Sequence, residues 1–335
     1  MLAGSSFKPA IGDKVWASTD FAGRNDWIYR LSDAALADIA KAIGKVRDRG
    51  GALDDVIRTD FDLPSLAGDL GEISRILGQG RGFVLIKGLG EAGYTEDELA
   101  IAFWGIGTHI GTGVSQSYHG DRLGHVRDIG EKGRYYTVGG ELEMHMDPTD
   151  VVGLVCVQPA ISGGLSRIAS SLNIHNIILQ ERPDLMETLY NGFFYRRRDA
   201  DVGGSGKGFN QRIPAFAELD GSIVCHYLPL SIRNAAESGA ELTAKEREAL
   251  ALVNDVATRP DVRLDMDFKR GDIQFLNNRV TLHSRTDYTD PPDPALKRHL
   301  LRLWLMMDSW PALPAHLRMQ GPTDRAGGGV AKAAV

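Results

Sequence analysis

From about residue 80 onwards the chain consists of short β-like runs separated by glycine and proline, and this pattern limits the fold more than any other feature. The clearest runs are 82–89, 134–140, 151–159, 221–229, 262–268, 271–285 and 298–307. Many short strands at irregular spacing are typical of a β-sandwich or jelly roll. We therefore predict a β-rich core over about residues 80–310.

The first 80 residues and two later stretches have helical patterns instead. The first helix has Ser32 as its N-cap and ends at Gly50 after basic residues, and Thr95 and Glu98 form a capping-box pattern at the start of another. The segment 63–80 is a further helix that ends near Gly78. The segments 173–190, with a break at Pro183, and 242–258 are helices that interrupt the strands. The predicted class is α+β.

The chain reads as one domain over residues 1–335, because it contains no internal repeat and no convincing linker. The segment 196–212 is rich in glycine and charge, which indicates a mobile loop that could act as a lid. The C-terminal segment from about 322 to 335 is predicted to be a mobile tail.

Charge and apolar runs exclude several partners. The net charge is −6 with both signs mixed along the chain, so no basic face for nucleic acid or an anionic membrane is expected. The longest apolar runs are far shorter than a membrane span, and the first residues do not resemble a signal peptide. Cys156 and Cys225 lie in apolar segments and are predicted to be buried thiols. These features favour a cytoplasmic protein that acts on a small molecule, with a homo-oligomer left open.

The stretch 140–159, GELEMHMDPTDVVGLVCVQP, places His145 and Asp147 two positions apart ahead of an apolar run. Residues at i and i+2 of a strand point to the same side. Further along, His283 follows another strand-like segment. Two histidines and a carboxylate can occupy one face of an octahedral Fe(II) and leave three positions open. We predict that these three residues form a metal site.

Other polar residues near these motifs have plainer interpretations. The pair His119 and Asp121 has the same spacing, but it lies between glycines with no apolar strand after it, which indicates a solvated turn. Gln116 is interpreted as a buried structural amide rather than a pocket residue, and Asn277 and Asn278 as turn residues or supports of the metal ligands. The remaining histidines have no partner pattern and are assigned to the surface or the core: His109, His125, His175, His226, His299 and His316.

The segment RHLLRLWL contains Arg298 and Arg302, which in a strand share a face with Leu300 and Trp304. Two arginines within an apolar strand are costly unless they meet an anion. The pair therefore indicates either an anionic ligand or two structural ion pairs.

Four segments taken in order, MHMD, GGLS, GDIQFLNNRVTLHSRT and RHLLRLWL, resemble the Fe(II)/2-oxoglutarate-dependent dioxygenases of the taurine dioxygenase and clavaminate synthase type. The resemblance covers roughly residues 80–310. It implies a double-stranded β-helix core (a cupin-like jelly roll) with helical insertions. It also implies that His145, Asp147 and His283 bind iron.

The same resemblance assigns the cosubstrate site. Arg298 would clamp the distal carboxylate of 2-oxoglutarate, since a guanidinium matches a carboxylate with two parallel bonds. Ser166, in GGLS, would add a hydroxyl where threonine is more usual. Arg302 would reach the cosubstrate or an anionic group of the prime substrate. The implied reaction consumes O2 and 2-oxoglutarate, releases succinate and CO2, and hydroxylates the substrate, with desaturation or cyclisation as the next outcomes. The expected substrate is a small polar acid or amino acid.

Two other classes of protein stay open on the residues alone. A zinc hydrolase could use two histidines and an aspartate to hold a nucleophilic water, but it has no need of Arg298. A non-enzymatic jelly-roll sensor of a small acid would need the arginines, but not the three metal-site residues.

Overall fold

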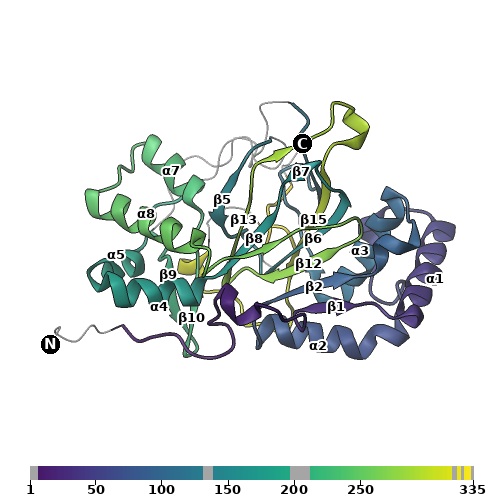
Figure 1. Ribbon diagram of the computed structural model, residues 1–335, viewed down its shortest axis with the longest axis horizontal. Coiled ribbons are helices and arrows are strands. Elements are labelled where there is room, and N and C mark those ends of the chain that lie inside the picture. Colours follow the sequence, from purple (N-terminus) through teal and green to yellow (C-terminus); the bar gives the residue numbers. More distant parts are fainter. Residues whose placement is uncertain (1–6, 131–138, 197–211, 319–322, 326–327, 333–335) are drawn as a thin grey trace.

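The computed structural model describes residues 7–130, 139–196, 212–318, 323–325 and 328–332. Its strands form two larger sheets with helices packed outside them (Figure 1). Among the helices of this part of the chain, none is long and apolar enough to cross a membrane. The class is α+β, as the sequence indicated.

The larger sheet has seven strands in the described residues, in the order β1-β2-β12-β6-β15-β3, with β4 also paired to β15. All of its pairs are antiparallel except β1 with β2. Strand β1 comes from the N-terminal region that the sequence had suggested to be helical, because its three residues are too short to show a strand pattern. The strands are β1 (Ile28–Arg30), β2 (Phe83–Lys87), β3 (Thr112–Gly113), β4 (Leu123–Arg127), β6 (Val151–Gln158), β12 (Ile273–Asn277) and β15 (His299–Met306).

The smaller sheet has four strands in the described chain, in the order β11-β8-β13-β5, and all of its pairs are antiparallel. Its strands are β5 (Leu142–His145), β8 (Ser166–Ser170), β11 (Leu264–Met266) and β13 (Thr281–Arg285). Two antiparallel pairs in the described residues lie apart from both sheets. One is the hairpin of β9 (Phe216–Leu219) with β10 (Ser222–Cys225), and the other joins β7 (Ser162–Gly163) to the distant β14 (Tyr288–Thr289). The predicted run 221–229 therefore belongs to neither large sheet.

Alternation along β15 shows where the core lies. Leu301, Leu303 and Leu305 belong to the apolar cluster shared with the N-terminal helices. Leu300 and Trp304 belong instead to a cluster that contains residues of both large sheets. The even-numbered positions of β15 therefore point between the sheets, and Arg302 shares that inner face.

Helices α1 (Asp33–Arg49), α2 (Ala67–Gly78) and α3 (Glu96–Ile110) cover the outer face of the larger sheet (Figure 1). The predicted ends are confirmed. The Ser32 side chain accepts from the Ala35 N–H, Gly50 ends α1 at φ 66°, and Thr95 with Glu98 forms the capping box of α3. A left-handed backbone at such a C-terminus favours glycine.

A second helical layer packs on the smaller sheet, on the opposite side of the molecule (Figure 1). The 173–190 stretch is broken at Pro183 as predicted, because proline cannot continue the hydrogen-bonded helix. This layer consists of α4 (Ser171–Glu181), α5 (Met186–Asn191), α7 (Pro229–Glu237) and α8 (Ala244–Thr258), of which α7 was not foreseen.

Some predicted segments fall wholly or partly outside the described residues. Most of the run 134–140 does so, as does nearly all of the proposed lid at 196–212. Within the predicted C-terminal tail, Asp324 accepts from the Ser115 N–H, and Val330 is buried with its own N–H donated to the Ser115 carbonyl. The described parts of the tail therefore contact the core, and its mobility stays a prediction. Cys156 and Cys225 are buried free thiols, as expected.

Candidate metal centre

His145 and His283 meet because β5 and β13 pair antiparallel with these two residues directly opposite each other. Their ring centroids are 4.3 Å apart. Their strand neighbours Met144, Met146 and Leu282 point the other way, into the apolar cluster under α4 and α8. The β-alternation therefore turns both imidazoles toward the space between the two sheets.

The ring of His145 is oriented by a backbone contact. Its Nδ1 lies 2.8 Å from the Glu143 carbonyl oxygen. A carbonyl only accepts hydrogen bonds, so Nδ1 carries the proton and Nε2 keeps its lone pair for a metal. Burial, together with His145 and Arg302, lowers the pKa of His283 to about 3 in spite of the nearby Asp147. His283 is therefore a neutral imidazole at physiological pH, which is the form that binds metals.

Asp147 lies two residues after the end of β5, and four neighbouring groups surround it. Its backbone N–H donates to the Asn278 side-chain oxygen over 3.2 Å. Its Oδ2 accepts from Trp304 Nε1 at 2.9 Å and lies 3.2 Å from Arg302 Nη1. The same oxygen is 3.8 Å from His283 Nε2. The carboxylate is thus fixed beside the two imidazoles before any ion is bound.

The surroundings of Asp147 keep it charged. Burial raises the pKa of this carboxyl, but the charge of Arg302, with smaller contributions that include the Trp304 hydrogen bond, outweighs burial, and the pKa lies below its usual value. Gln116 positions Arg302: its Oε1 accepts from Arg302 Nε at 2.7 Å, while its side-chain NH2 donates to the Arg302 carbonyl, also at 2.7 Å. Gln116 is a buried amide, as the sequence indicated.

These three residues suit a metal ion. One donor atom from each of His145, Asp147 and His283 lies within 4.8 Å of the other two. Two neutral nitrogens and one carboxylate oxygen form the donor set of the facial arrangement that binds non-haem Fe(II). The structure therefore brings together all three of the predicted metal ligands.

Arg298 lies just before β15, buried in a cavity of about 230 Å³ whose lining includes Cys156, Gly164, Phe268 and Leu300. Its Nη2 donates to the Gly164 carbonyl at 3.3 Å, but its Nη1 is buried without a hydrogen-bond partner among the described residues. A Cβ on Gly164 would come within 2.8 Å of Arg298 Nε, so the glycine allows this close approach.

The charge of Arg298 is only partly compensated. Burial, and next the neighbouring Arg285, lower its pKa to about 10. Its guanidinium lies 5.2 Å from the centre of the Tyr288 ring, and no carboxylate of the described residues forms an ion pair with it. A buried guanidinium with a spare donor fits a carboxylate ligand.

Ser166 is buried on the inner face of β8, and its hydroxyl donates to Gln274 Oε1 at 3.2 Å. In the described structure the hydroxyl makes no hydrogen bond to Arg298. The hydroxyl oxygen still has lone pairs, so it can accept a bond, and the proton can rotate to a ligand.

The structure places the two His-x-Asp pairs in different surroundings. Asp121 bonds the Ser117 hydroxyl, the His119 N–H donates to the same hydroxyl, and the His119 side chain is exposed in a turn. Neither residue belongs to a group that could hold a metal in the described chain. Asn278 supports Asp147, while Asn277 accepts from the Arg279 N–H in the turn after β12.

The role of Trp304 was missed in the sequence. The alternation along the strand places Trp304 on the same face as Arg302. A buried indole N–H usually donates to an acceptor, so this pattern could have predicted a polar partner for Trp304. His125 and His299 are brought together with Glu96, a grouping that spacing along the chain did not reveal.

The fold and site together define a metal-dependent enzyme of the type with two histidines and one carboxylate, and comparison with known proteins gives the family. The family model described as "Taurine catabolism dioxygenase TauD, TfdA family" matches residues 45–304. The chain is 31% identical to FR-33289 synthase of Streptomyces rubellomurinus over 324 residues, which cover 92% of this chain and 94% of that protein. It is also 31% identical over 321 residues to a taurine hydroxylase-like protein of Stachybotrys chartarum, covering 88% and 79%. The chain belongs to the TauD/TfdA family.

Solved structures are similar in fold at low sequence identity. Asparagine oxygenase in complex with Fe(II), 2S,3S-3-hydroxyasparagine and succinate superposes with a TM-score of 0.69 at 15% identity, over 84% of this chain and 93% of that one. The non-haem iron oxygenase OrfP in complex with Fe and α-ketoglutaric acid has a TM-score of 0.62 at 14% identity, over 84% and 94%.

The protein is therefore an oxidoreductase, a 2-oxoglutarate-dependent dioxygenase that uses iron, 2-oxoglutarate and O2. Among the three classes that the residues alone left open, the family identifies the oxygenase rather than the zinc hydrolase or the non-enzymatic sensor.

Proposed function

We propose that His145, Asp147 and His283 bind the Fe(II) of this oxygenase. The observation that carries the proposal is the cross-strand pair of histidines with Asp147 fixed beside it by Trp304 and Arg302. Bound there, Fe(II) would supply the site at which O2 is activated, while the protein fixes the three donors and leaves the opposite positions for ligands.

Arg298 is proposed to bind the distal carboxylate of 2-oxoglutarate. Its unpaired Nη1, its burial in a cavity and the absence of an ion pair to its guanidinium in the described residues support this role. The Ser166 hydroxyl would turn from Gln274 to the same carboxylate. Burying a charged guanidinium without a counter-ion is unfavourable, so an ion pair with the carboxylate of 2-oxoglutarate would offset that cost.

Arg302 is proposed to serve both the metal site and the substrate. It already pairs with Asp147, and it stacks 4.9 Å from the centre of the Trp304 ring. Its positive charge faces the region between the sheets where an anionic group of a ligand would arrive. Gln116 would keep the guanidinium in this orientation.

The prime substrate is proposed to be a small polar or anionic molecule, such as an acid or an amino acid, and hydroxylation the main outcome, before desaturation or cyclisation. Buried Arg302 supports an anionic group. A related protein of Streptomyces, 30% identical over 196 residues, is named uridine-5'-phosphate dioxygenase, and the asparagine oxygenase structure contains a hydroxylated amino acid.

The core is proposed to be a double-stranded β-helix, a cupin-like jelly roll. Two antiparallel sheets that share an apolar cluster and hold the site between them support this description.

Iron stoichiometry after anaerobic loading tests the metal assignment. His145→Ala, Asp147→Ala and His283→Ala should each lose the iron of this site and all coupled 2-oxoglutarate consumption, whereas His119→Ala should retain the wild-type iron content. Near wild-type turnover in any of the three ligand variants would refute the assignment. Succinate release with a panel of small acids, amino acids and nucleotides would then identify the substrate.

A further inference from the structure

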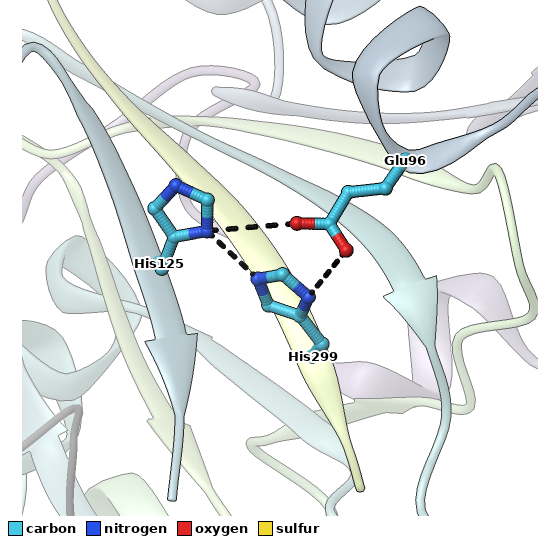
Figure 2. Close-up of side chains that lie close together, drawn as sticks. All are labelled: Glu96, His125 and His299. Atoms are coloured by element: carbon cyan, nitrogen blue, oxygen red, sulfur yellow. Dashed lines mark hydrogen bonds and ion pairs between the residues drawn. The ribbon is translucent and has the colours of Figure 1, made fainter. Parts of the chain in front are cut away.

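A second group of metal-binding side chains lies outside the proposed iron site, on the outer face of the larger sheet. Glu96 begins α3, His125 is on β4 and His299 begins β15 (Figure 2). One donor atom from each residue lies within 4.8 Å of the other two. His299 points away from the iron site, because the odd-numbered positions of β15 face the helices.

The contacts within this group are close. His125 Nδ1 lies 3.0 Å from His299 Nε2 and 3.9 Å from Glu96 Oε1, while His299 Nδ1 lies 3.4 Å from Glu96 Oε2 (Figure 2). Zinc bonds to nitrogen or oxygen are about 2.0–2.2 Å long, which places two tetrahedral ligand atoms roughly 3.3 Å apart. The two contacts of His299 use different nitrogens of its ring, and the 3.0 Å contact is a hydrogen bond. With one nitrogen taken from each ring, the three donor atoms lie within 4.8 Å of one another before the adjustment that binding requires.

One residue of the group is buried, His299, and the other two, His125 and Glu96, are exposed and can change rotamer. The His299 side chain is only 4% exposed, whereas those of His125 and Glu96 are 58% and 46% exposed. Burial lowers the pKa of His299, which favours the neutral ring that metals bind, and an ion would replace the hydrogen bond between His299 Nε2 and His125 Nδ1. One cation takes one nitrogen from a given ring, and small rotations of the two exposed side chains bring their donors to it.

The charge around the group is mixed. The N-terminal end of α3 and Arg127 on β4 are positive and oppose a cation. Against them, the first turn of α3 carries Glu96 and Asp97, while its third carboxylate, Glu98, is already paired with Arg47.

We infer that Glu96, His125 and His299 form a second metal site, which binds a divalent first-row transition ion, with Zn²⁺ as its natural occupant. Two imidazoles and a carboxylate are borderline donors that suit Zn²⁺ better than Mg²⁺ or Ca²⁺. Three protein ligands leave one tetrahedral position for water. The ion would join the start of α3 to β4 and β15, and so tie the helical layer to the strand that follows Arg298. This inference does not depend on the proposed function.

Zinc stoichiometry tests the site, with the iron site as an internal reference, since its donors also bind Zn²⁺. After dialysis against micromolar Zn²⁺, the wild-type protein should hold two ions per chain by elemental analysis. His125→Ala and Glu96→Gln should each hold one, and so should His145→Ala. The double variant His125→Ala/His145→Ala should hold none, and His119→Ala, a matched exposed histidine, should keep two.

Thermal unfolding gives a second measurement, which is independent of oxygenase activity. Zn²⁺ should raise the Tm of His145→Ala, because a ligand of the folded state stabilises it, and should leave the Tm of His125→Ala/His145→Ala unchanged. Both His125 and Glu96 are exposed, so their variants should fold and retain oxygenase activity. Zinc stoichiometry in His125→Ala equal to that of the wild type, or an equal zinc-induced Tm rise in the single and double variants, would overturn the inference.

Discussion

Arg298→Gln tests the cosubstrate site because it should affect two quantities differently: the stability of the ligand-free protein and the affinity for 2-oxoglutarate. In the folded protein burial, and next the neighbouring Arg285, lower the pKa of Arg298 from its usual value to about 10. A difference of this size corresponds to about 3 kcal/mol by which the folded state disfavours the charged guanidinium. Glutamine removes this cost, together with the bond to the Gly164 carbonyl and the contact with the Tyr288 ring. The bond to the Gly164 carbonyl and the contact with the Tyr288 ring each contribute about 1 kcal/mol to stability.

The free energy of unfolding of ligand-free Arg298→Gln should therefore be unchanged or slightly raised. Binding of 2-oxoglutarate should weaken, because a charge-assisted bond to a carboxylate contributes about 1.5–3 kcal/mol and an unpaired buried carboxylate costs more. The apparent KM for 2-oxoglutarate should rise roughly tenfold to several hundredfold, at about 1.4 kcal/mol per factor of ten.

The assay combines urea unfolding of the ligand-free protein with succinate release at varied 2-oxoglutarate. Arg298→Lys is the matched control, and it should recover only part of the affinity because an ammonium cannot form two parallel bonds. Iron stoichiometry should stay at the wild-type value in both variants. Normal 2-oxoglutarate affinity in Arg298→Gln, or a loss of stability of several kcal/mol, would refute the reasoning.

Three further predictions follow from individual contacts. Trp304→Phe removes the Nε1–H bond to Asp147 while keeping the ring, so iron affinity should fall about tenfold to a hundredfold; equilibrium dialysis with unchanged affinity would contradict this. His119→Ala with Asp121→Ala should leave iron stoichiometry at the wild-type value, and loss of iron would show that the wrong pair was chosen. Burial lowers the pKa of His175, so the unfolded chain binds its proton more readily and stability falls as pH drops below about 6.5. Between pH 7.5 and 5.5 the urea midpoint should fall less in His175→Gln than in the wild type. Equal falls would show that protonation of His175 does not cause the loss of stability.

The sequence predicted the parts of the site that depend on local alternation. The i, i+2 spacing of His145 and Asp147 placed them on one side of a strand end, and the period of two in RHLLRLWL placed Arg302 on the inner face with Trp304. Helix ends at Ser32, Gly50 and Thr95 were equally local, because a cap depends on a few neighbouring residues.

The parts that the sequence did not predict depend on which distant strands become neighbours. The grouping of His283 with His145 and Asp147 was predicted from the family resemblance, but the register that sets His283 directly opposite His145 joins strands far apart in the chain, and no local pattern determines it. The group of Glu96, His125 and His299 draws on a helix and two strands for the same reason. Strand β1 has only three residues, too few for a periodic signal.

The proposed oxygenase activity requires one iron held by His145, Asp147 and His283, with 2-oxoglutarate as its ligand. The most direct test is the visible spectrum of the protein after Fe(II) and 2-oxoglutarate are added under nitrogen. The wild-type protein should develop a metal-to-ligand charge-transfer band that saturates at one iron per chain at the oxygenase site and shifts when the substrate is added. His283→Ala should develop none, and His125→Ala should match the wild type. A wild-type protein that gives no band, or a band that persists unchanged in His283→Ala, would contradict the central claim.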